Sequence, residues 1–171
     1  MSVYRTSNFE ADVGLDATII DTNVIVAKFF EADQNHSDAR YYPDELVEQI
    51  IIPSAVLVES WGMLVGSRKR MDLGLRLLSW IQDPGNNVVL VPSHGDNFDN
   101  MCHVVGQLRV DCVDSILIAL ASEISAKCRS GRSVRIATFD TRDFLRASRT
   151  RLGNFELLDL TTLEELQFGS A

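Results

Sequence analysis

Short apolar runs separated by longer segments of helical spacing constrain the fold of this chain more than any other feature. The runs are rich in isoleucine and valine, and they are too short to form buried helices. Strands that alternate with helices usually form a parallel sheet with helices on both faces. The pattern therefore predicts a three-layer α/β/α sandwich around a central, mostly parallel sheet of four to five strands. Four strands are predicted at residues 17–20, 50–52, 88–91 and 134–137, with a fifth candidate at 155–158.

Helical patterns fill the segments between these runs. A helical mixture of polar and apolar residues extends from the first run to about residue 30, and Pro53 and Ser54 suit the start of another helix. Residues 1–17 are polar and aperiodic, so we expect a loose N-terminal extension before a single domain at 18–171. Further helices are expected at 44–50, 54–67, 71–82, 96–107 and 111–128.

The composition excludes several classes of protein. Hydrophobic residues at 46% and charged residues at 23% are ordinary for a globular domain. No stretch approaches the ~20 apolar residues of a membrane span, and the N-terminus lacks a basic-then-apolar signal pattern. Cys102, Cys112 and Cys128 have no CxxC spacing and indicate reduced thiols. We therefore expect a cytoplasmic protein without a membrane segment.

Charge is distributed unevenly along the chain. The net charge is −8, yet residues 129–151 hold seven arginines against Asp140 and Asp143, a local net charge of +5. A basic patch on an acidic body can steer a phosphate ligand to one place. Solvated helix ends and turns explain the same charges equally well.

Four acidic residues are notable for their position. Asp21 ends the first predicted strand, and Asp140 follows the fourth. Glu59 lies one turn into the helix after the second strand, and Asp114 is in the first turn of the clearest helix, close to Asp111. Ligands of parallel sheets bind beyond the carboxyl ends of the strands, where Asp21 and Asp140 are expected. Early helical turns allow Glu59 and Asp114 to face the same edge.

Each acid also has a purely structural explanation. Asp21 and Asp140 could be turn residues, and Asp111 and Asp114 could cap their helix. Glu59 could occupy the polar edge of its helix. The occurrence of one acid per element, in this order, favours a shared site over four separate coincidences.

Clustered carboxylates raise one another's pKa, and a divalent cation relieves their repulsion. Mg²⁺ and Mn²⁺ prefer oxygen ligands and keep positions open for water and phosphate. A bound metal of this kind activates water and neutralises charge on a phosphate. This chemistry needs no histidine or cysteine nucleophile.

Five short motifs occur in sequence order. They are Ile19-Ile20-Asp21-Thr22-Asn23, His36-Ser37-Asp38-Ala39, residues 52–59 ending in Glu59, Val113-Asp114-Ser115-Ile116-Leu117-Ile118-Ala119-Leu120-Ala121, and Ala137-Thr138-Phe139-Asp140-Thr141-Arg142-Asp143-Phe144. Together they span about residues 18–145 and resemble the motifs of the PIN-domain family, especially toxin ribonucleases of the VapBC type.

The resemblance implies a PIN-like fold and a metal-dependent endoribonuclease that acts on single-stranded RNA with Mg²⁺ or Mn²⁺. Its catalytic and metal-binding set would be Asp21, Glu59, Asp114 and Asp140, with Asp111 and Asp143 as further candidates. Asn23 would support Asp21, and His36 would be structural. An antitoxin protein and a second copy of the chain are the expected partners besides RNA.

Arginines provide a candidate RNA-binding surface. Arg142, Arg146 and Arg149 are spaced so that a helix would place them on one face, close to Asp140. The same face could instead dock an acidic partner or remain solvated.

Other functions fit these residues less well than the nuclease does. A haloacid-dehalogenase-like phosphatase needs an acid two residues after its nucleophilic aspartate, where this chain has Asn23. A receiver domain needs a late lysine, and no lysine follows Lys127. A catalytically inactive PIN module that binds protein or RNA is the remaining alternative, although such a module would be expected to lose some of the four acids.

Overall fold

A computed structural model describes residues 3–6, 9–12, 16–40, 42, 49–92, 98–127, 133–150 and 155–162. Its central sheet has five strands, all parallel, in the order β5-β4-β3-β6-β7. These strands are β3 (Ala17–Ile20), β4 (Gln49–Pro53), β5 (Val88–Val91), β6 (Val134–Thr138) and β7 (Glu156–Asp159). The predicted α/β fold class is therefore confirmed, and the fifth strand candidate is real.

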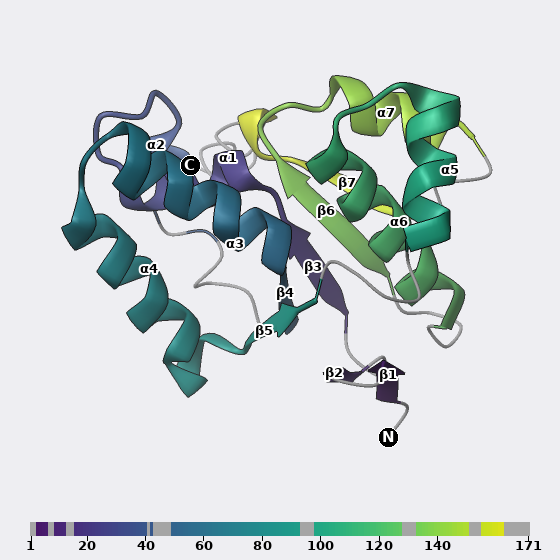
Figure 1. Ribbon diagram of the computed structural model, residues 1–171, viewed down its shortest axis with the longest axis horizontal. Helices are drawn as coiled ribbons and strands as arrows, with labels where there is room; N and C mark the ends of the chain where they lie inside the picture. Colours follow the sequence, from purple (N-terminus) through teal and green to yellow (C-terminus); the bar gives the residue numbers. More distant parts are fainter. Residues whose placement is uncertain are drawn as a thin grey trace, which may run out of the picture.

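Helices cover both faces of the sheet (Figure 1). Parallel crossovers are almost always right-handed, so chain segments that cross in opposite directions lie on opposite faces. Four helices lie on one side: α1 (Thr22–Phe29), α2 (His36–Ala39), α3 (Ser54–Trp61) and α4 (Met71–Gln82). Three helices lie on the other: α5 (Phe98–Leu108), α6 (Cys112–Lys127) and α7 (Arg142–Ser148).

The core lies between these layers. Ile19, Ile51 and Ile136 come from three adjacent strands and are fully buried. Their β-branched side chains suit a strand that is packed on both faces. No helix in the described part of the chain has the length and apolar character needed to cross a bilayer.

Two segments, residues 1–17 and 44–50, differ from the sequence-based predictions. Residues 1–17 were expected to be loose, but β1 (Val3–Thr6) and β2 (Phe9–Asp12) pair as an antiparallel hairpin. Both strands contain charged residues, unlike the apolar runs of the central sheet, so a search for buried strands does not reveal them. The helix predicted over 44–50 is wrong at its end, because Gln49 and Ile50 belong to β4: Gln49 pairs with β3, and Ile50 pairs with both β3 and β5. Residues 43–48 lie outside the described part of the chain.

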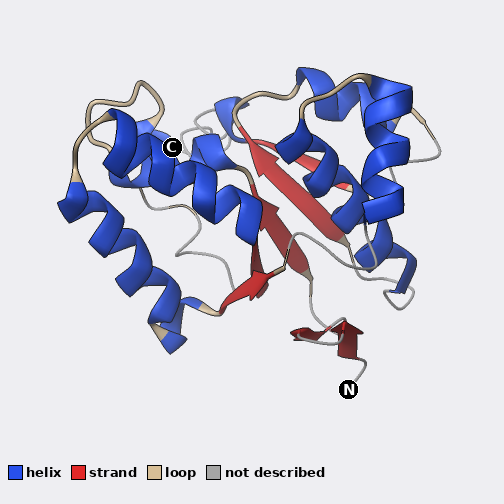
Figure 2. Ribbon diagram, viewed as in Figure 1, coloured by secondary structure: helices blue, strands red, loops and turns tan. Residues whose placement is uncertain are grey.

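The helix predicted over 54–67 changes its winding partway. It is α-helical to Trp61 and continues as the π-helix η1 (Gly62–Ser67). Single-turn π segments often occur at functional sites. Short 3₁₀ turns, η2 (Pro84–Asn86) and η3 (Leu160–Thr162), follow α4 and β7. Figure 2 shows how the helices and strands alternate along the fold. Residues 93–97, where α5 was expected to begin, are outside the described part.

Candidate active site

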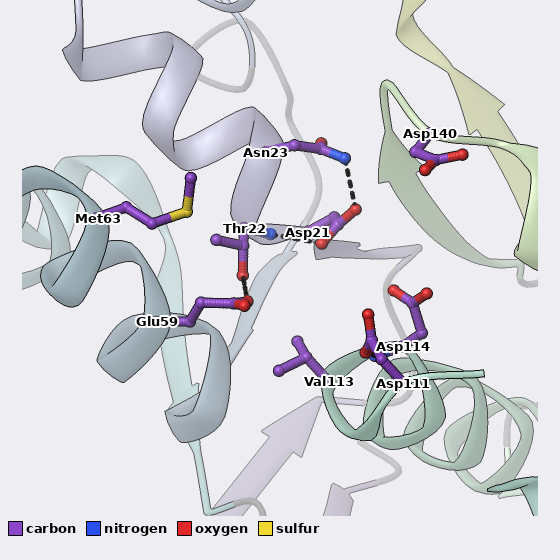
Figure 3. Close-up of a pocket in the computed structure, with 9 residues that line it drawn as sticks. All are labelled: Asp21, Thr22, Asn23, Glu59, Met63, Asp111, Val113, Asp114 and Asp140. Atoms are coloured by element: carbon purple, nitrogen blue, oxygen red, sulfur yellow. Dashed lines mark hydrogen bonds between the residues drawn. The ribbon is translucent and has the colours of Figure 1, made fainter. Parts of the chain in front are cut away.

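The sheet has a topological switch point between β3 and β6. From β3 the chain crosses to β4 on one side, and from β6 it crosses to β7 on the other. Loops diverge at such a point and leave a crevice at the carboxyl ends of the strands. A pocket of about 210 Å³ lies there (Figure 3). It is lined by Asp21, Thr22, Asn23, Glu59, Met63, Asp111, Val113, Asp114 and Asp140.

Asp21 lies at the base of the pocket and is the most firmly held of the acids. Its side chain is buried, with 7% of the residue exposed. One carboxylate oxygen, Oδ1, accepts a hydrogen bond from the backbone N–H of Thr22 at 2.6 Å. The other, Oδ2, accepts from Asn23 Nδ2 and from Thr138 Oγ1, both at 2.7 Å. Asp21 is thus also the N-cap of α1, in agreement with its structural interpretation, and it lines the pocket as well.

Asn23 and Thr138 join the ends of β3 and β6. Asn23 Oδ1 accepts from the backbone N–H of Phe139 at 3.2 Å, and Asn23 Nδ2 also lies 3.0 Å from Thr138 Oγ1. Thr138 Oγ1 accepts from the backbone N–H of Asp140 at 3.0 Å. Asn23 therefore holds the Asp21 carboxylate against the end of β6. Thr138 was not singled out from the sequence, although its place at the end of β6, beside Asp140, was the available signal.

Glu59 reaches the pocket from α3, on the opposite side from α6. The residue is exposed, and its Oε2 accepts a hydrogen bond from Thr22 Oγ1 at 2.6 Å. This bond links α3 to the first residue of α1. The hydrogen bond from Thr22 therefore holds Glu59 toward the pocket, and the sequence position of Glu59 did not predict this bond.

Asp111 caps helix α6, and both Asp111 and Asp114 line the pocket. Helix α6 begins at Cys112, and Asp111 Oδ1 accepts from the backbone N–H of Asp114 at 2.9 Å. This is an N-cap bond that satisfies a free amide of the first turn. The two carboxylates nevertheless both line the pocket, and they point toward Asp21 and Asp140 (Figure 3).

Asp140 and Asp143 have different surroundings. Asp140 is exposed, lines the pocket, and accepts a weak bond at 3.3 Å from the backbone N–H of Arg142. Asp143 is not among the lining residues. Its Oδ1 lies 3.2 Å from Arg146 Nη2 and 3.5 Å from Arg142 Nε. Asp143 therefore balances the arginines of α7 rather than lining the pocket.

Negative charge in the pocket is not balanced by a cation among the lining residues, which include no lysine or arginine. Burial raises the pKa of Asp21 from 3.8 to about 6, although hydrogen bonds from Thr138 and Thr22 oppose this effect. Burial also raises the pKa of Asp114 from 3.8 to about 7, with additional contributions from the negative charges of Asp111 and Asp21. Both carboxyls therefore resist ionisation in the protein without a cation.

The donor set fits a hard divalent cation. Five carboxylates face one pocket, and oxygen-rich sets of this kind suit Mg²⁺ or Mn²⁺. Within the described residues, no three acidic, histidine or cysteine side chains are yet close enough together to hold one ion. The five carboxylates nevertheless share one pocket, and the pKa values of Asp21 and Asp114 are raised, so a cation bound between them would relieve their repulsion.

Residues outside the acidic set complete the site. Met63 from η1 and Val113 from α6 are its apolar lining, and neither was predicted as a site residue from the sequence. His36 lies elsewhere: its Nδ1 is 2.7 Å from the carbonyl oxygen of Ala27, which can only accept a hydrogen bond. His36 therefore ties α2 to α1, in agreement with a structural role.

Comparison with known proteins identifies one family and a shared fold. The family model of the PIN domain matches residues 18–150. No significant match is found among curated proteins.

Solved structures resemble the chain at low sequence identity. VapC20 from Mycobacterium tuberculosis, described as a sarcin-ricin loop cleaving toxin, aligns with a TM-score of 0.62 and 15% identity over 78% of this chain and 97% of that one. VapBC2 from Rickettsia felis, bound to a promoter DNA fragment, gives a TM-score of 0.59 and 14% identity over 84% and 98%. A toxin–antitoxin complex from Klebsiella pneumoniae gives a TM-score of 0.56 and 15% identity over 84% and 97%. At these identities the likeness concerns the fold.

Proposed function

Because this chain belongs to the PIN-domain family, we propose that it is a metal-dependent endoribonuclease that hydrolyses RNA phosphodiester bonds. The observation that carries the proposal is the pocket at the switch point, where five carboxylates converge without a lysine or arginine among the lining residues. The raised pKa values of Asp21 and Asp114 agree with it, because catalytic and metal-binding groups are commonly perturbed in this way.

We assign the metal to Asp21, Glu59, Asp114 and Asp140. Mg²⁺ or Mn²⁺ bound there would activate water and neutralise charge on the phosphate. Asp21 is fixed by three donors, so it offers a rigid ligand. Asp111 adds negative charge at the rim, whereas Asp143 is occupied by arginines and is a weaker candidate.

The partner that we propose is an antitoxin. Two structures that share the fold are described as a toxin and as a toxin–antitoxin complex. By this analogy the chain is the toxin of a type II pair that acts in the cytoplasm as a homodimer. The analogy rests on the fold, and function resides in the site, so the nuclease proposal does not depend on it.

The first test is metal dependence. We expect the purified protein to cleave single-stranded RNA with Mg²⁺ or Mn²⁺, to stop in EDTA, and to resume when the metal is restored in excess. A labelled RNA resolved on a gel measures cleavage, and circular dichroism in EDTA controls for unfolding. Cleavage that persists in EDTA would contradict a metal mechanism. If the protein neither cleaves RNA nor shows Mn²⁺ binding in a calorimetric titration, the catalytically inactive PIN module is favoured.

The arginines of α7 form the proposed RNA-binding surface. Arg142 and Arg146 side chains are 83% and 51% exposed, and Arg149 follows the last residue of the helix. Arg142 and Arg146 pair with Asp143, but both arginine side chains are largely in solvent, so these ion pairs have a small net energy. The arginines therefore remain available to phosphate, which the forked guanidinium suits.

We expect the triple change Arg142→Gln, Arg146→Gln and Arg149→Gln to weaken RNA binding and to flatten its salt dependence. Each lost phosphate contact removes about 0.7 from the slope of log K against log salt for single strands, so three contacts remove about 2. Fluorescence anisotropy at several salt concentrations measures the slope. Mn²⁺ affinity should stay unchanged, because these side chains do not line the pocket.

A matched triple variant provides the control. All three control residues are exposed cations. Arg70 lies at the N-terminal boundary of α4, Arg76 lies within α4, and Lys127 is the last residue of α6. Their change to glutamine alters the net charge equally but should leave the slope nearly unchanged. Equal slopes for the two triple variants would exclude a specific RNA role for α7 and leave an acidic partner or solvent as its counterpart.

A further inference from the structure

Thr22 contacts two of the proposed metal ligands at once (Figure 3). Its backbone N–H donates to Asp21 Oδ1 at 2.6 Å, and its hydroxyl donates to Glu59 Oε2 at 2.6 Å. Asp21 follows β3 and Glu59 belongs to α3, so the residue joins acids from two separate elements. Thr22 is buried, whereas Glu59 is exposed.

Glu59 needs such a contact if it is to serve as a ligand. A glutamate on an exposed helical face has several rotamers, and holding one of them costs conformational entropy. Asp21 also repels the Glu59 carboxylate, and this repulsion contributes to the raised pKa of Asp21. Without an anchor, both effects favour turning Glu59 toward solvent. A buried hydroxyl at 2.6 Å offsets them through a hydrogen bond to a charged acceptor.

We infer that Thr22 is a positioning residue, whose hydroxyl holds the Glu59 carboxylate beside Asp21 so that the cation meets a preformed pair of ligands. This inference rests on the proposed metal-dependent function. It differs from a capping or packing role in one respect: only the hydroxyl is needed, and only while Glu59 is present. The backbone bond to Asp21 does not involve the side chain, so it is expected to survive changes such as valine or serine at this position.

Two substitutions separate the hydroxyl from the shape of the side chain. Thr22→Val keeps the β-branched form and the burial but removes the donor. Thr22→Ser keeps the donor and removes a methyl group. Thr161→Val is the matched control, because Thr161 Oγ1 donates to Asp159 Oδ1 at the same 2.6 Å, away from the pocket.

Mn²⁺ affinity, measured by calorimetry, is the main readout. Thr22→Val should weaken binding by about 10- to 100-fold, which is typical when a residue that orients a metal ligand is lost. Thr22→Ser should stay within a few-fold of wild type, and Thr161→Val should match it. In a Glu59→Ala background, Thr22→Val should cause no further loss. Wild-type affinity in Thr22→Val, or an equal loss with and without Glu59, would overturn the inference.

A double-mutant cycle on protein stability tests the same contact without metal. In EDTA, Thr22→Val and Glu59→Ala should be non-additive in unfolding midpoint, because each removes the same hydrogen bond. Additive effects would overturn the contact on which the inference depends. If wild type fails to bind Mn²⁺, the proposed function falls and the inference falls with it. If wild type binds and Thr22→Val binds equally well, only the inference is overturned.

Discussion

Replacing Asp21 by asparagine should lower the rate of RNA cleavage by on the order of 10²- to 10³-fold, the usual cost of losing a preorganised electrostatic contact at a reacting centre. Asparagine has the size and shape of aspartate but carries no charge. Asp21 lies at the base of the pocket and is held by three donors, so a neighbouring acid cannot easily take its place.

The fold should survive this change. Asparagine loses one acceptor toward Thr22, Asn23 or Thr138, but it also removes a buried charge whose ionisation is disfavoured. These effects oppose each other. Single-turnover cleavage and a melting curve, measured together, test both expectations. Asp83→Asn is the control, because Asp83 accepts from Gly85 N–H in a turn that precedes β5, at the opposite edge of the sheet. Full activity with normal melting in Asp21→Asn would refute the proposed role.

Replacing Asp114 by asparagine should stabilise the metal-free protein at pH 8 by about 1–2 kcal/mol, after allowance for the solvent that screens a partly exposed carboxylate. The cause is that burial, with the charges of Asp111 and Asp21, raises the pKa of Asp114 to about 7. Asparagine removes the charge that the folded pocket disfavours. Chemical unfolding in EDTA measures the difference between the two proteins.

The sign of the pH dependence follows from the raised pKa. Below the ordinary pKa of 3.8, Asp114 is protonated whether the chain is folded or unfolded, so wild type carries no penalty. As the pH rises toward about 7, the unfolded chain ionises more readily and wild type loses stability. The advantage of Asp114→Asn should therefore grow between about pH 4 and pH 7 and then level off. Saturating Mn²⁺ should reverse it, because the cation binds the folded wild type more tightly.

Asp99→Asn is the matched control for this prediction. Asp99 is exposed and lies in the first turn of α5, as Asp114 lies in the first turn of α6. An ordinary acid at that position stabilises its helix through the dipole, so Asp99→Asn should be slightly destabilising. Destabilisation of both variants would mean that the helix dipole outweighs the crowding at Asp114.

The fold could be predicted from the sequence to a large extent. Residues 17–20 and 88–91 match β3 and β5 at both ends, and 71–82 matches α4. These segments have a single strong pattern and a clear stop, such as Pro84 after α4. The failures lie where local pattern is weak. Gln49 and Ile50 lie at the join between a predicted helix and a strand. Pairing of both residues with β3, and of Ile50 also with β5, decides for the strand.

The candidate site could be predicted only in part. The order of the acids and their places after strands were readable, and the pocket contains Asp21, Glu59, Asp114, Asp140 and also Asp111. Asp143 shares the closing motif with Asp140, yet it is paired with arginines instead. Asp140 and Asp143 are three residues apart, and this spacing does not show which carboxylate faces the crevice. The answer depends on where α7 begins, which is at Arg142.

By itself, the sequence determined the alternation of strands and helices, and hence the parallel sheet and the edge at which Asp21 and Asp140 lie, because hydrophobic periodicity and turn residues act locally. The tertiary structure alone decided the contacts across that edge. Thr22 meets Glu59 across 37 residues of chain, and Asn23 meets Thr138 across 115. It also decided the raised pKa values of Asp21 and Asp114, because desolvation and charge repulsion depend on which groups share a volume of space.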